Sequence, residues 1–99
     1  MDELLGKELK SIPLYSDGVG ETVGKIGFHE KGILVKTSRT EKIPDGYVKS
    51  LRARQRLSLG RVEAEMTAFD IMGTQLKLSF VLLEPHFFEL QQRIEKKGR

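Results

Sequence analysis

Apolar and polar residues alternate along two segments in the last third of the chain. Residues 62–68 and residues 76–82 each place an apolar side chain at every second position. This period of two is typical of strands that bury one face. The segment Asp-Ile-Met-Gly-Thr at 70–74 lies between them and favours a turn. The pattern therefore predicts two antiparallel strands joined by a short connection.

A helix is predicted directly after the second of these strands, over residues 84–97. Pro85 suits the first turn of a helix, where a missing N–H costs nothing. Phe87, Leu90 and Ile94 then fall on one face, which we expect to pack on a core. The neighbouring Phe88 cannot share that face. We expect it either to cover an adjacent strand or to be exposed as a contact surface.

The middle of the chain shows weaker alternation. Residues 25–37 predict a hairpin with its turn at residues 30–32. Residues 47–51 predict a short strand or a single helical turn. Leu57 and Leu59 alternate with small residues and are assigned to the next strand, in which Gly60 indicates a bulge or bend.

The N-terminal part is expected to be less regular. Residues 2–10 predict a short helix, residues 11–15 an extended lead-in around Pro13, and residues 16–20 a glycine-rich loop. The chain of 99 residues is thus expected to form one domain: an N-terminal lead-in at 1–19, a β-meander at 20–83 and a C-terminal helix at 84–97. The expected fold is mainly β with α, a small antiparallel β-barrel or sandwich closed by the C-terminal helix.

Composition narrows the class of protein. No apolar run approaches the roughly 18 residues of a membrane span. The chain has no cysteine, and its acidic start lacks the basic flank and apolar stretch of a signal peptide. We therefore expect a cytoplasmic protein.

Candidate catalytic groups are sparse. Gly18, Gly20 and Gly24 do not match the spacing of a phosphate-binding loop. His29 and His86 are expected to be separate surface residues, too few for a zinc site. The carboxylates of Glu63 and Glu65 are expected to face solvent beside basic neighbours. We expect no catalytic residues, no metal and no cofactor.

Positive charge is concentrated in the middle of the chain. Residues 31–61 hold nine Lys or Arg against two Asp or Glu. On a strand, the alternating arginines of 52–56 would project from one face. Such a face attracts acidic proteins or phosphates, although it is also compatible with ordinary solvated surface. The predicted binding residues are Lys49, Arg52, Arg54, Arg56 and Arg61.

The order of predicted elements resembles a known superfamily. Residues 24–36 resemble the first two strands of pleckstrin-homology-like and GRAM-type domains, and residues 41–51 are similar to their third strand. The terminal helix is similar to the helix that closes those domains. The resemblance implies a scaffold that binds proteins or peptides through a strand edge or a groove beside the helix. Phosphoinositide binding is not expected, because Ser38 stands where lipid-binding members have Arg.

These observations favour a non-catalytic adaptor domain. Its basic face would dock an acidic protein partner or an anionic surface. The alternative is a nucleic-acid-associated module in which the same arginines contact phosphates. Self-association is also open, because an uncovered strand edge favours pairing with a second copy.

Overall fold

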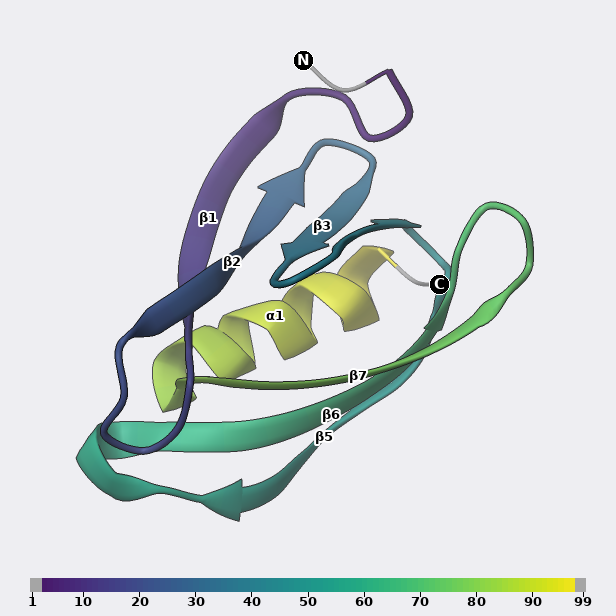
Figure 1. Ribbon diagram of the computed structural model, residues 1–99. Coiled ribbons are helices and arrows are strands. Elements are labelled where there is room, and N and C mark those ends of the chain that lie inside the picture. The colour runs from purple at the N-terminus through teal and green to yellow at the C-terminus, as the bar shows by residue number, and fades with distance from the viewer. Residues whose placement is uncertain (1–2, 98–99) are drawn as a thin grey trace.

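The computed structural model describes residues 3–97 as an antiparallel sheet with one helix (Figure 1). A short 3₁₀ turn (Ser58–Gly60) joins the fifth and sixth strands. The elements are β1 (Glu8–Tyr15), β2 (Thr22–His29), β3 (Gly32–Lys36), β4 (Thr40–Pro44), β5 (Val48–Arg56), β6 (Arg61–Phe69), β7 (Gln75–Leu83) and α1 (Glu84–Lys97).

The seven strands form one open sheet in the order β4-β3-β2-β1-β7-β6-β5. The two halves of the sheet meet where β1 pairs with β7, and this pairing involves only Tyr15 and Val81. β4 and β5, at the two ends of the order, do not pair with each other. A mainly β fold with a C-terminal helix is confirmed, in an open, sandwich-like arrangement; the sheet is not a closed barrel.

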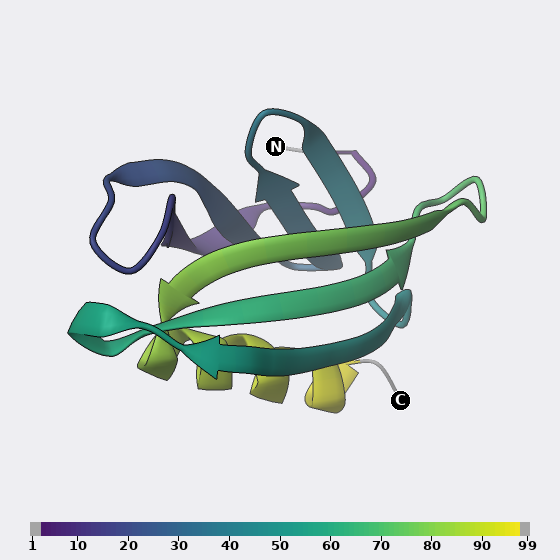
Figure 2. The same ribbon diagram turned by 60° about the horizontal axis from the view of Figure 1, so that its bottom comes forward.

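The core lies between the two halves of the sheet and α1. Side chains on β6 alternate between buried and half-buried positions, as the sequence pattern predicts. Figure 2 shows α1 running along one side of β5, β6 and β7. Phe87 and Leu90 are buried and Ile94 packs against the same cluster, so the predicted helix and its apolar face are confirmed. The hairpin of β2 and β3 is also confirmed, with Phe28 opposite Ile33.

The predicted N-terminal helix is wrong for the part that the structure describes, residues 3–10. Residues 3–5 form turns, and β1 begins at Glu8, so the region expected as a lead-in contributes a full strand to the meander. Ile12 and Leu14 bury their side chains from this strand. Pro13 is tolerated because β1 pairs with β7 only at Tyr15, which leaves one side of the strand at Pro13 without a partner strand.

The connection after β5 also differs from the prediction. β5 is a strand of nine residues, longer than expected, and Leu57 and Leu59 belong to the turn that follows it. Leu59 (φ 59°) and Gly60 (φ 72°) both adopt left-handed backbone conformations. Two consecutive residues of this kind reverse the chain direction, so the local alternation of apolar and small residues reflects a turn instead of a strand.

The histidines are less exposed than expected. His29 is buried, and its Nδ1 lies 3.0 Å from the carbonyl oxygen of Gly6. The backbone N–H of Lys31 donates to the carbonyl of Leu5 at 2.7 Å, so the N-terminal segment packs over the β2–β3 turn. His86 is half-buried at the start of α1. The sequence pattern did not indicate this packing because the covering segment was expected to be helical.

Candidate functional site

The predicted basic face centres on β5, an end strand of the sheet. β5 forms backbone pairs with β6 on one side, and on its other side it has no partner strand among residues 3–97. Figure 2 shows β5 at the margin of the layer of strands that lies along α1. The strand contains no Asp or Glu. Its four basic residues, all exposed, are Lys49, Arg52, Arg54 and Arg56.

A bulge in β5 separates its arginines. Arg52 lies opposite Glu65, which points away from the core, whereas Arg56 lies opposite the buried Val62. The register shifts between Ala53 and Gln55, and the intervening Arg54 has no residue opposite it. The expectation that the arginines at 52, 54 and 56 project from one face is therefore wrong. An extra residue in a strand reverses the facing of every residue beyond it.

The β5 arginines form exposed ion pairs with the same chain. Arg52 Nη2 lies 3.0 Å from Glu65 Oε1, and Arg54 Nη1 lies 3.5 Å from Glu65 Oε2, so two cations share one carboxylate. Arg56 Nη2 lies 3.1 Å from Glu84 Oε2, with its side chain 81% exposed. Exposed pairs of this kind contribute about 0–1 kcal/mol to stability. These pairs therefore add little to stability, and the arginines keep their charge at the surface.

Arg61, the fifth predicted binding residue, has a different environment. Its Nη1 donates to the carbonyl oxygens of Asp17 at 2.9 Å and Gly20 at 2.7 Å. Its Cζ lies 3.8 Å from the centroid of the Tyr15 ring, a cation–π contact. These contacts hold the β1–β2 loop against the start of β6. The guanidinium group of Arg61 is thus engaged in contacts within the chain, and we no longer count Arg61 as part of the predicted basic face.

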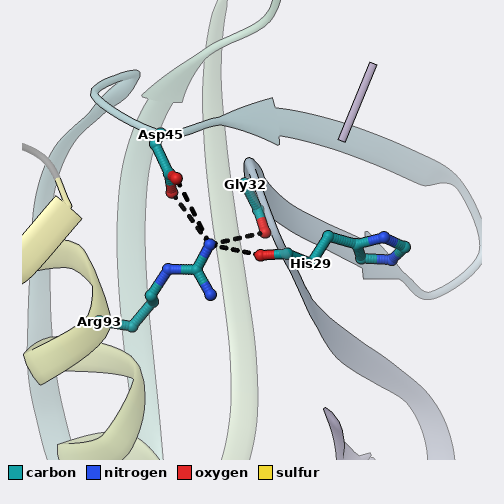
Figure 3. Close-up of polar contacts among 4 residues, drawn as sticks. All are labelled: His29, Gly32, Asp45 and Arg93. Carbon is teal, nitrogen blue, oxygen red and sulfur yellow. Dashed lines mark hydrogen bonds and ion pairs between the residues drawn. The ribbon is translucent and has the colours of Figure 1, made fainter. Parts of the chain in front are cut away.

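Arg93 on α1, which was not among the predicted site residues, is a largely buried arginine with partners on three other segments. Figure 3 shows its Nη2 donating to the carbonyl oxygens of His29 (2.5 Å) and Gly32 (3.3 Å) and to the carboxylate of Asp45 (3.2 Å). The side chain is only 12% exposed. Arg93 therefore joins α1 to the β2–β3 turn and to the β4–β5 connection. Its position three residues after the buried Leu90, on the apolar side of the helix, was the available signal.

The remaining predicted groups are distributed over separate elements. Phe88 is exposed on α1 and contacts Phe87 edge-to-face, with 5.7 Å between ring centroids; its role as a contact surface stays a prediction. Glu65 pairs with Arg52 and Arg54, the basic neighbours expected of it, whereas the side chain that donates to Glu63 Oε1, at 3.2 Å, is the amide of Gln55. Within the described part of the chain, no group of three His, Asp or Glu residues could hold a metal ion.

Comparisons with known proteins provide no relative from which to transfer a function: no family model, no curated protein and no solved structure matches this chain. Between residues 3 and 97, α1 does not have the length and apolar character needed to cross a membrane.

Proposed function

We propose that this chain is a non-catalytic adaptor domain that binds an extended, acidic segment of a partner protein along the free edge of β5. The observation on which the proposal rests is the combination found on that strand: an edge without a partner strand, four exposed cations and no acid. The proposed contact residues are Lys49, Arg52, Arg54 and Arg56.

The free edge gives the interaction its geometry. An end strand offers backbone N–H and C=O groups to which an extended segment can add as a further strand. β5 spans nine residues, whereas β4 at the opposite end spans five and finishes at Pro44, which has no N–H to donate. β5 is consequently the more extensive edge for pairing with another chain.

Charge then selects the kind of partner. Two copies of β5 placed edge to edge would bring arginines together, and such like-charge contacts oppose self-association through this strand. An acidic segment would instead place carboxylates beside Arg52 and Arg54 on one face and beside Arg56 on the other. We therefore propose an acidic protein segment as the occupant, in preference to a second copy of this chain.

The order of strands and helix bears on the class of domain that we propose. A meander of strands followed by one C-terminal helix supports the proposal of a pleckstrin-homology-like scaffold. The separation of Arg52 and Arg56 onto opposite faces is less suited to tracking a line of phosphates, so nucleic-acid binding is treated as an alternative outcome of the test.

The test measures binding of synthetic probes by fluorescence anisotropy. The probe is a labelled peptide of alternating Glu and Thr, about ten residues long to match the length of β5. We expect saturable binding, weakened at least about tenfold by Arg52→Glu/Arg54→Glu/Arg56→Glu because attraction becomes repulsion. The matched control, Lys36→Glu/Arg39→Glu/Lys42→Glu, changes the same charge at exposed positions around β4 and should retain binding.

Three outcomes would contradict the proposal. The peptide could fail to bind at all, the two triple variants could bind it equally, or a labelled oligothymidylate could bind more tightly than the peptide. The last result, with a steep loss of affinity on adding salt, would establish the nucleic-acid alternative. Circular dichroism of each variant confirms that the fold is retained.

A further inference from the structure

An open hollow lies at the end of β5 that leads into β6. The β5–β6 turn and the β1–β2 loop meet there, as Figure 1 shows, although they are about 40 residues apart in sequence. The hollow has a volume of about 540 Å³. It is lined by Asp17, Gly18, Val19, Arg56, Leu57 and Ser58.

The walls of this hollow are held in place by contacts within the chain. Arg61 donates hydrogen bonds to two carbonyl oxygens of the β1–β2 loop. Within that loop, Asp17 Oδ1 accepts the backbone N–H of Val19 at 2.7 Å. A Cβ atom on Gly18 would lie 3.1 Å from both Leu57 Cβ and the backbone nitrogen of Ser58, so the loop and the turn are in close contact. A ligand entering here would meet a loop and a turn already joined by contacts within the chain, which lowers the entropic cost of binding.

One exposed aliphatic residue, Val19, lines the hollow, and a second, Leu59, directly follows the lining residue Ser58 in sequence. Val19 is 73% exposed and Leu59, on the adjoining turn, is 70% exposed. Leu59 also has a left-handed backbone, a conformation that Gly or Asn adopts more readily. Its side chain therefore gains little burial within the chain while the backbone is strained. Residues held in rarely populated backbone conformations cluster at functional sites.

We propose that this hollow receives one large apolar side chain of the same acidic segment that pairs with β5. This inference rests on the proposed function. Arg56 belongs both to the free edge of β5 and to the lining of the hollow, so the two surfaces are continuous. A segment extended along β5 reaches the hollow within one or two residues of the strand's end. The partner is thus an acidic stretch flanked by one aromatic or large aliphatic residue.

The charges at this end of the molecule agree with that occupant. The carboxylate of Asp17 is engaged by backbone N–H groups of its own loop. Arg56 contributes positive charge to the lining of the hollow, where its exposed ion pair with Glu84 can be exchanged, and β5 contributes no acid. An apolar contact at the centre with polar and charged groups at the rim is the arrangement found in many protein interfaces.

The experiment compares acidic peptides that differ only in a terminal residue. Each Glu/Thr peptide carries either Phe or Ala, at the N-terminus in one pair and at the C-terminus in another, because β5 can be paired in either direction. For one of the two pairs, we expect the Phe peptide to bind the wild-type protein about tenfold more tightly, since it buries an aromatic ring.

Variants then test whether the hollow is the place where the Phe side chain binds. Val19→Ser should reduce the preference for Phe to about twofold while leaving affinity for the Ala peptide unchanged, because only the apolar wall is altered. The matched control is Val23→Ser, at an exposed valine on β2 outside the hollow. It should retain the full preference for Phe.

The outcomes separate this inference from the proposed function. The Phe and Ala peptides could bind equally well while binding is still lost in the Arg52→Glu/Arg54→Glu/Arg56→Glu variant. This result would overturn the proposed role of the hollow and leave the proposed binding along β5 intact. A preference for Phe that survives Val19→Ser would also overturn it. Binding of neither peptide would overturn both proposals. Sedimentation with phosphatidylserine vesicles, lost in Val19→Ser in the absence of any Phe preference, would assign the exposed aliphatic residues to a lipid surface instead.

Discussion

The arginines of β5 and the arginines at positions 61 and 93 have the same charged group in opposite environments. On β5, Arg52 and Arg56 are exposed and meet single carboxylates at the surface. Arg61 and Arg93 instead donate to backbone carbonyls of segments more than 40 residues away in sequence. The first pair keeps its charge at the surface, whereas the second pair holds distant parts of the chain together. Density of positive charge along a sequence does not distinguish the two roles.

The largest expected effect comes from removing Arg93. Arg93→Ala would leave the carbonyls of His29 and Gly32 and the carboxylate of Asp45 without this donor in a largely buried setting. We expect a loss of about 3 kcal/mol in the free energy of unfolding, measured by urea denaturation. The control is Glu95→Ala, at an exposed position on the same helix, which should change stability by less than about 0.5 kcal/mol. An equal effect of the two substitutions would show that Arg93 is not a structural residue.

A smaller loss is expected at Arg61. Arg61→Ala removes two hydrogen bonds and the contact with the Tyr15 ring, which together should contribute about 2 kcal/mol. Amide hydrogen exchange should also become faster in the β1–β2 loop, since this side chain holds the loop in place. Unchanged exchange at residues 16–21 would contradict that role.

A gain in stability is expected at Leu59. Leu59→Asn replaces a leucine held in a left-handed backbone conformation by a residue that adopts this conformation more readily. The substitution should raise the free energy of unfolding by about 0.5–1 kcal/mol. The matched control, Ile71→Asn, replaces another exposed aliphatic residue in a turn whose φ is not left-handed and should not produce the gain. A loss of stability at position 59 would mean that its side chain makes a contact that its exposure conceals.

The smallest effects on stability are expected on β5. Arg52→Ala and Arg56→Ala should each change the free energy of unfolding by less than about 0.5 kcal/mol, because their ion pairs are exposed. Thermal or urea denaturation would measure this. A loss above about 1 kcal/mol at either position would place these arginines with Arg61 and Arg93 as structural residues.

The elements with the strongest periodicity were predictable, and their predictions succeeded. Strict alternation placed β6 and β7, and the spacing of Phe87, Leu90 and Ile94 placed α1 with its buried face. Each of these signals depends on local sequence and on burial of one face. Long-range pairing then reinforces them.

The failures arose where local pattern and tertiary contact disagree. Residues 2–10 have leucines at helical spacing, yet the described part of this segment covers His29 and enters β1. The bulge at Arg54 reverses the facing of Arg56, and no residue type in the strand indicates that a bulge is present. Arg61 and Arg93 have structural roles because the fold brings distant backbone carbonyls close to them. The sequence pattern does not show which groups far apart in the chain lie close together in space.

The most direct test of the proposed docking edge is a ¹H–¹⁵N NMR titration of the protein with the acidic peptide. We expect the largest shifts, and new protection from hydrogen exchange, at backbone amides of Val48–Arg56, with little change along β4. Protection arises because an added strand accepts hydrogen bonds from the free edge. Shifts centred on β4 or α1, or no shifts at saturating peptide, would contradict the assignment of β5 as the binding edge.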